Sequence, residues 1–511
     1  MKKQVKSAVA LALGSSILST GLPAYAKEDG RWLKGEYHNH TTQSNDAQNT
    51  LELLLNKAFN EYDMDWLGVS DHLRLSERDT KGNPLPGGDI PMSEGIINYQ
   101  VPGIKQLMQK GNYRNKIIFS GAEWDMPTYE HFGIGIVGDA KSLQKDLKAL
   151  NQFEYLFTDR NPDLFHPEDV KKWEKKNDRA YKTKADARRA LQWLEKNYKQ
   201  KGYAILNHPH SPKTVYTIAD LRDFNNIAPN VAFGFEGMPG NQMEPDRGGY
   251  NLSTPENRTY GGADYMLAKV GGSWDALLGE GRRFWNFSNA DSHFEISDDR
   301  LYSSGYFPGQ YSKNYTWVEG NQPEDVIEGM RSGKSFGVYG DLINALEFNA
   351  KAKRKTAEMG EELKVKKGET VQLTITFKSP EKNNNGDSVQ VDHVDLISGD
   401  VTGKVKPGTP EYYDDTNDSA KVLKRFTSKD WKTDKDGYHT ITYKVKAKKD
   451  QYFRLRGTNL GLNIPGETKN GEPLIDVAIT TEDNETRFEQ INERNYKDLW
   501  FYSNPIFVDV K

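Results

Sequence analysis

Seven of the ten histidines in this 511-residue chain fall in five short segments, four of which also carry carboxylates. These segments are His38-Asn39-His40 with Asp46, Asp71-His72, Glu123 with His131, Asn207-His208-Pro209-His210, and Asp291-Ser292-His293. Alternate residues of a strand point to the same side, so a His-x-His pair at a strand end directs both imidazoles at one place. The chain has no cysteine, so any metal ion must be held by His, Asp and Glu. The five segments therefore predict a multinuclear metal site.

Short apolar runs that are typical of β-strands precede or adjoin these segments. The predicted strands cover residues 66–70, 116–120, 132–137, 203–206, 231–235 and 284–288. Apolar residues at helical spacing predict a helix after Asn49, with Glu52 as its capping-box partner, and a second helix over 187–198. From residue 31 to about 340, this alternation predicts an α/β domain with a largely parallel sheet. A β/α barrel fits this pattern, because its strand ends place side chains at one mouth.

Beyond residue 340 the pattern changes to strict alternation of apolar and polar residues, as in Val371, Leu373, Ile375 and Phe377. Polar, Asn- and Asp-rich turns separate these runs, which favours an all-β immunoglobulin-like sandwich. The predicted organisation is therefore a barrel over residues 27–340 and a β domain over 341–511.

The first 26 residues have the three zones of a secretory signal peptide: lysines, an apolar stretch over 8–18, and small residues before a cleavage point after Ala26. We therefore expect an exported, extracytoplasmic protein. No later apolar run is long enough to predict a transmembrane segment. Lys and Arg number 69 against 73 Asp and Glu, so no basic field supports a nucleic-acid-coating role.

Taken in order, the metal-ligand segments resemble the PHP superfamily, named for polymerase and histidinol phosphatase. More narrowly, they are similar to the CehA/McbA-type metallohydrolases, and so is the ending Tyr502-Ser503-Asn504-Pro505-Ile506. The resemblance implies a distorted seven-stranded β/α (TIM-like) barrel with two or three divalent ions, zinc, manganese or iron, at its mouth. In CehA/McbA-type chains a β-sandwich often follows the barrel.

The resemblance also implies a ligand set for each ion. The first ion would take His38, His40, Glu123 and Asp291. Glu123 would bridge to a second ion, held also by His131 and His208. A third ion would take Asp46, His72 and His293, with Asp46 standing where some relatives carry histidine. Asp71 would orient an imidazole as a partner of the ligands, or serve as a buried strand-end carboxylate.

The chemistry expected of such a site is metal-dependent hydrolysis of phosphomono- or phosphodiesters, because bound metal ions activate water and neutralise phosphoryl oxygens. His210 is expected to point to the same side of the chain as His208 and is the candidate general acid, with an ordinary hydrogen-bonding role as the alternative. Arg74 and Arg247 are candidates for binding a substrate anion. Glu236 is a candidate substrate-binding or ligand-supporting carboxylate, and the Gly- and Pro-rich residues 238–262 are expected to cover the mouth.

Two other functions remain open. The same metal ions could hydrolyse a carbamate, ester or amide, because a carbonyl is polarised by the same Lewis acids. Alternatively, the β domain could bind a glycan or cell-wall polymer and the barrel could be a silent scaffold, although a silent barrel should have lost ligands.

Overall fold

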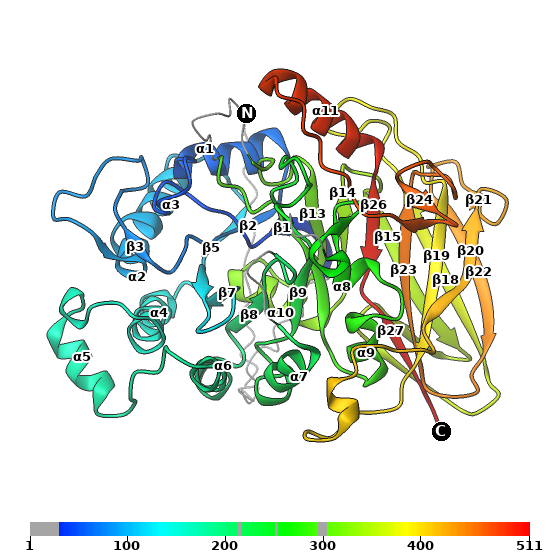
Figure 1. The fold of residues 1–511 in the computed structure, drawn as a ribbon, viewed down its shortest axis with the longest axis horizontal. Helices are drawn as coiled ribbons and strands as arrows, with labels where there is room; N and C mark the ends of the chain where they lie inside the picture. The colour runs from blue at the N-terminus through cyan, green and yellow to red at the C-terminus, as the bar shows by residue number, and fades with distance from the viewer. Residues whose placement is uncertain (1–29, 212–215, 251–253, 295–303) are drawn as a thin grey trace, which may run out of the picture.

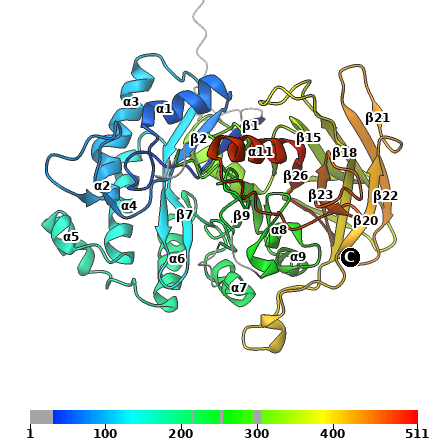
Figure 2. The same ribbon diagram turned by 45° about the horizontal axis from the view of Figure 1, so that its top comes forward.

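The computed structural model describes residues 30–211, 216–250, 254–294 and 304–511. The predicted signal peptide lies outside this range. Most helices lie on one side of the molecule and the C-terminal strands on the other (Figure 1, Figure 2). The longer helices are α1 (Leu51–Asn56), α3 (Val101–Gln109), α4 (Leu143–Phe157), α5 (Pro167–Glu174), α6 (Lys184–Tyr198), α7 (Ile218–Ile227), α9 (Ser273–Gly279), α10 (Pro323–Ser332) and α11 (Asn484–Lys497). Short α2 (Met92–Gly95) and α8 (Tyr265–Ala268) complete the set, and π-helical turns extend α1 and precede α3.

The larger sheet runs through the whole molecule. Its order is β17 (Glu362–Val365), β27 (Ile506–Val510), β23 (Gln451–Thr458), β26 (Trp500–Ser503), β14 (Ser335–Tyr339), β13 (Ser312–Val318), β1 (Arg31–Glu36), β2 (Trp66–Val69) and β5 (Ile117–Ser120). Strands β1, β2 and β5 are parallel to one another, while β13 and β14 are antiparallel to their neighbours. Strands β19 (His393–Asp400) and β20 (Lys421–Thr427) attach through β23.

A second sheet of five strands faces the first in the N-terminal part. Its order is β12 (Trp285–Ser288), β9 (Gly234–Met238), β8 (Gly202–Leu206), β7 (His131–Ile136) and β6 (Ala122–Asp125). Strands β8, β9 and β12 are parallel, but β6, β7 and β8 are antiparallel, so the sheet is mixed.

The prediction of a closed barrel is wrong, because no sheet of the described residues closes on itself. The first gap lies between β5 and β6, which end different sheets although only Gly121 separates them in the chain. A Cβ at Gly121 would lie 2.2 Å from Tyr203 Oη and 2.7 Å from the Ile134 carbonyl oxygen, so this tight passage requires glycine.

The second gap lies at the free edge of β12, where asparagine side chains take the place of the backbone hydrogen bonds of a neighbouring strand. The backbone N–H of Ser288 on β12 donates to Asn314 Oδ1 (2.8 Å), and that of Asn286 donates to Asn504 Oδ1 (2.8 Å). The Asn314 amide in turn donates to the Ser288 carbonyl (2.5 Å). These bonds satisfy the edge of β12 without strand pairing, which is why the sheets meet here but do not join.

The C-terminal part also differs from the expected separate sandwich. The predicted alternation is present: Val371, Leu373, Ile375 and Phe377 are all buried on one face of β18 (Thr370–Lys378). That strand belongs to an antiparallel sheet ordered β16 (Lys355–Glu358), β15 (Ala345–Ala352), β18, β22 (His439–Lys446) and β21 (Lys432–Thr433). The layer that packs against it, however, is the C-terminal half of the large sheet. That half is continuous with the N-terminal half, because β26 pairs with β14. The two parts of the chain therefore share one sheet and are not independent layers.

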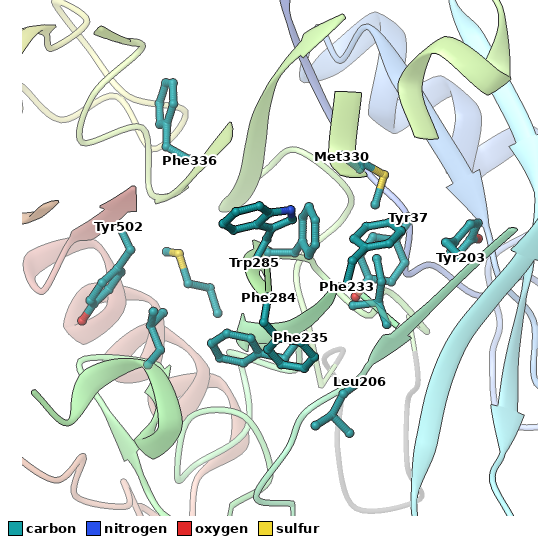
Figure 3. Packing of buried hydrophobic residues seen from close by; sticks show 14 of the residues in the cluster. Tyr37, Tyr203, Leu206, Phe233, Phe235, Phe284, Trp285, Met330, Phe336 and Tyr502 are labelled. Carbon is teal, nitrogen blue, oxygen red and sulfur yellow. The ribbon is translucent and has the colours of Figure 1, made fainter. Parts of the chain in front are cut away.

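Aromatic side chains fill the space between the layers (Figure 3). Trp285 on β12 lies between Phe336 and Tyr502 on one side and Tyr37 and Phe233 on the other (Figure 3). All five are essentially removed from solvent. Buried aromatic rings supply a large apolar area each, so this cluster joins the N-terminal strands to β26.

The first helix begins one residue later than predicted. Thr50, not Asn49, is the N-cap, and its hydroxyl accepts from the Leu53 N–H. The Asn49 amide instead donates to the Ser292 carbonyl and hydroxyl, each at 3.1 Å. Asn49 therefore ties the start of this helix to a loop of the predicted metal site. The second predicted helix is present as α6, with Thr183 and Asp186 forming its capping box.

Buried ion pairs also cross between the two parts. Asp275 on α9 accepts from Arg454 Nε (2.8 Å), Arg454 Nη2 (2.7 Å) and Tyr452 Oη (2.8 Å). We expect Asp275→Asn to lower the free energy of unfolding by about 3–5 kcal/mol, because it leaves the Arg454 cation buried and unpaired. Urea denaturation measures this change. Glu493→Gln, in the exposed pair with Lys497, is the control and should change stability by less than about 1 kcal/mol. Equal effects of the two substitutions would contradict the prediction.

Candidate metal centre

All nine predicted metal ligands converge in the N-terminal part of the structure. His38 and His40 follow β1, His72 follows β2, His208 follows β8, and Asp291 follows β12. Isolated backbone bridges hold these loops against one another, pairing Asn39 with Ser292 and His72 with Glu123. His208 and Asp291 have φ values of 27° and 48°. Side-chain-bearing residues rarely adopt this left-handed conformation, and such residues cluster at functional sites.

Glu123 on β6 lies at the middle of the cluster. Its Oε1 atom is 3.0 Å from His38 Nε2, 3.1 Å from His131 Nδ1 and 3.3 Å from His208 Nε2. Its Oε2 atom is 3.1 Å from His72 Nδ1 and 3.3 Å from His40 Nε2. One buried carboxylate thus faces five imidazoles, as a residue that bridges two metal ions would.

The first predicted ligand group is assembled. Single ligand atoms of His38, His40, Glu123 and Asp291 all lie within 4.8 Å of one another, and all four residues are buried. Asp291 Oδ1 is 3.0 Å from His38 Nε2 and 3.1 Å from His40 Nε2. Yet His40 Nε2 and Asp291 Oδ1 have no hydrogen-bond partner with suitable geometry. Buried polar atoms normally find a partner, so these atoms fit ligands directed at a common cation.

The second and third predicted groups are only partly matched, because the sets whose ligand atoms all lie within 4.8 Å of one another are His72, Glu123 and His131, and His40, His72 and His293. Glu123 Oε1, His131 Nδ1 and His208 Nε2 lie 3.1–3.3 Å from one another. Asp46 lies 3.0 Å from His72 Nε2 and 3.8 Å from His293 Nε2. His72 stands between the groups, because its Nδ1 faces Glu123 and its Nε2 faces Asp46. The buried histidines and carboxylates can therefore hold metal ions.

Residues behind the ligands fix the orientation of two imidazoles. Glu236 Oε1 lies 3.2 Å from His38 Nδ1, which directs His38 Nε2 towards Glu123 and Asp291. Ser44 Oγ lies 3.1 Å from His40 Nδ1 and donates to Asp71 Oδ1 at 2.9 Å. Such partners set the tautomer and basicity of ligand imidazoles. Asp71 thus supports His40 through Ser44.

The electrostatics of the cluster favour positive charge. Burial raises the pKa of the Glu123 carboxyl, but the imidazoles of His131, His38 and His72 outweigh burial and hold that pKa well below its usual value. Burial lowers the pKa of His40, yet the neighbouring Asp291 and Glu123 carboxylates raise it to about 9. Burial also lowers the pKa of His131, but the Glu123 and Asp125 carboxylates outweigh burial and raise that pKa to about 10. The carboxylates therefore stabilise a cation among the histidines.

The cluster forms the floor of a cavity of about 780 Å³. Its walls come largely from the predicted covering segment, including Pro239, Gly240, Asn241, Gly248 and Gly249. A ligand in this cavity would contact His72, His131 and His208 directly. The site can therefore bring a small molecule against the candidate metal ligands.

The remaining predicted residues have different surroundings. Arg74 forms a two-point ion pair with Asp125 (2.7 and 2.8 Å), and its Nη2 is 3.4 Å from His131 Nε2, so it is held beside the site. Glu236 is wholly buried behind His38 and does not line the cavity, which assigns it to supporting a ligand and not to contacting substrate. His210 is partly exposed and is likewise absent from the cavity lining, although His208 and Ser211 close to it in the chain are part of that lining. Its Nδ1 lies 2.7 Å from Asp264 Oδ1. This pair fixes the ring and leaves Nε2 as the atom able to give up a proton.

Arg247 is also wholly buried, so its expected contact with a substrate anion is replaced by a structural role. Its Nη1 donates to Asp476 Oδ1 (3.1 Å) and to Asp498, and its Nη2 donates to Tyr311 Oη (2.8 Å) and to the Asp498 carbonyl (2.9 Å). Arg247 therefore fastens the segment that walls the cavity to the C-terminal part of the chain.

Three polar residues of the site were not predicted. Asn207 donates to Glu123 Oε1 (2.8 Å), Asn241 donates to Asp291 Oδ2 (2.7 Å), and Asp125 accepts from His131 Nε2 at 3.0 Å. Asp125 could have been found from its spacing, because it stands two residues after Glu123 on the same strand. Asn241 could not, since only the path of a long irregular loop brings it to Asp291.

Comparison of the chain with family models, curated proteins and solved structures gave no match in any of the three. Within the described residues, no helix is long and apolar enough to cross a membrane.

Metal binding should release protons and weaken as the pH falls. His40 and His131 keep their protons up to a pKa of about 9 and about 10, so a cation that binds their nitrogens at pH 7 must displace those protons. We expect calorimetry with Mn²⁺ or Zn²⁺ in two buffers of different protonation enthalpy to show release of about one proton or more. His40→Ala should lower the metal content, while His166→Ala on an exposed turn should not. Binding without proton release would contradict the assignment.

Proposed function

We propose that this protein is a metal-dependent hydrolase of phosphomono- or phosphodiesters. The observation that carries the proposal is the position of Glu123, within 3.3 Å of five imidazoles at the floor of an open cavity. Divalent ions bound there would activate water and neutralise the charge that develops on phosphoryl oxygens. The resemblance of the ligand order to the PHP superfamily, and to its CehA/McbA-type members, supports the same reaction class. Two or three zinc, manganese or iron ions and export from the cell belong to this proposal.

The chain's own residues would orient the reacting groups. Glu236, Ser44 and Asn207 fix His38, His40 and Glu123, so the ligand atoms are in place before substrate enters. Asn241 holds Asp291 from the cavity side. His210, held by Asp264, would give its Nε2 proton to the leaving oxygen.

A second candidate substrate class is a neutral ester, carbamate or amide. Of the described residues that line the cavity, none is Lys or Arg, so the walls add no positive charge for a phosphate dianion. An uncharged carbonyl substrate needs no such charge. Parallel assays with a nitrophenyl phosphodiester, a nitrophenyl phosphate and a nitrophenyl carbamate distinguish the two classes.

Removing the central carboxylate should abolish turnover. We expect Glu123→Gln to lower kcat by more than about 100-fold, which exceeds the usual effect of losing a residue behind a metal ligand. Initial rates on the nitrophenyl phosphodiester with added Mn²⁺ measure the loss. Glu52→Gln on the exposed face of α1 is the matched control and should retain activity. Full activity of Glu123→Gln would rule out hydrolysis at this cluster.

The role of His210 can be separated from metal binding through the leaving group. We expect His210→Gln to slow substrates with alkyl alcohol leaving groups by about 100-fold or more, since these need a proton. Nitrophenolate leaves without one, so nitrophenyl substrates should be slowed far less. Metal content should stay unchanged, because His210 faces Asp264 and not Glu123. Equal slowing of both substrates would refute the general-acid role.

A further inference from the structure

A second cavity, separate from the metal centre, lies between α3, α4, β5 and the start of α10. Strand β5 lies between helices α3 and α4 (Figure 1), and the floor of the cavity is formed by β5 and the end of β7. The cavity has a volume of about 220 Å³, which is below the range of about 300–1,000 Å³ usual for drug-sized ligands and suits a slender one. It shares no lining residue with the metal cavity. His131 and Ile136, at opposite ends of β7, place the two cavities about 16 Å apart.

The lining of this cavity is predominantly aliphatic. It comprises Val101, Ile104, Met108, Ile118, Phe119, Ile136, Val137, Leu143 and Leu147, with a few polar residues. Ile104 and Ile136 remain 7% and 6% exposed, whereas core residues such as Leu194 are at 0%. Met108 on α3 is 39% exposed. Ile104 and Ile136 are therefore largely covered by the fold, and Met108 is the apolar lining residue that stands open to water.

Polar groups in the cavity indicate the chemistry of the occupant. Ser120 Oγ is buried without a hydrogen-bond partner among the described residues. Lys105 stands at the rim, exposed and with no ion pair in the described part of the chain. The only acid among the lining residues, Asp139, accepts from the Ser142 N–H at 2.9 Å and lies near the Lys201 cation, and both hold the pKa of its carboxyl below the usual value. The Asp139 charge is therefore offset by Lys201, which leaves Lys105 as a cation beside an apolar interior.

We propose that this cavity binds a single-chain amphiphile with a terminal carboxylate, of the medium-chain fatty acid type. The alkyl chain lies against Ile104, Phe119 and Val137, where burial of each methylene favours binding. The carboxylate pairs with the Lys105 ammonium group at the rim. This binding requires neither metal ions nor the proposed hydrolysis.

Calorimetric titration of the full chain with decanoate, 1-decanol and decyltrimethylammonium tests the proposal. We expect decanoate to bind about threefold tighter than decanol and about tenfold tighter than the cationic chain, as one partly exposed ion pair allows. Lys105→Glu should reverse that order, while Lys110→Glu on the same helix, outside the cavity, should preserve it. Equal affinity for all three chains would overturn the carboxylate assignment.

Substitutions at the exposed rim residue Ala140 test the location. Ala140→Trp places a ring over the mouth and should abolish decanoate binding, whereas Ala140→Ser should leave it unchanged. Binding that survives Ala140→Trp, or no binding to the unaltered chain, would overturn the site. Sedimentation is measured in parallel, because a dimer that dissociates with Ala140→Trp would show that a second copy of the chain covers this surface instead.

Discussion

The arrangement of the N-terminal part depends on one constraint: the Glu123 carboxylate is buried among five imidazoles and must be compensated there. An isolated buried carboxylate is costly, and the residue stays ionised only because positive charge surrounds it. That requirement constrains the four chain segments that carry these imidazoles, since each imidazole lies within 3.3 Å of one of the two Glu123 oxygen atoms. The left-handed conformations of His208 and Asp291 and the backbone bridge between His72 and Glu123 follow from the same demand.

The sequence predicted the site better than it predicted the fold. Ligand types, their order and their places beside short apolar runs are local features, and the nine residues do lie together. Strands β2, β5, β7, β8 and β12 start within about one residue of their expected positions, because their apolar runs are bounded by polar residues. Strand β9 begins three residues late, at Gly234, since Val231 to Phe233 are equally apolar but precede it in the turn from α7.

Whether the sheets close into a barrel could not be predicted from local sequence, because closure depends on which strand edges pair over long sequence separations. Asn314 and Asn504 lie 26 and 218 residues from the β12 groups that they bind. Nothing in their local sequence distinguishes them from surface asparagines. The shared sheet was missed for a related reason: β26 is a short strand whose four residues are all buried, and its local sequence does not show that it pairs with Phe336, Gly337 and Val338 of β14.

The buried Arg247 makes the N-terminal part of the chain depend on the C-terminal part. Its guanidinium belongs to the wall of the metal cavity, but its counter-ions, Asp476 and Asp498, belong to the far end of the chain. A fragment that stopped near residue 340 would keep every candidate metal ligand and would lose both anions. It would then hold an unpaired cation where the cavity wall must pack, so the candidate metal cavity depends on the entire folded chain and not on its ligand-bearing part alone.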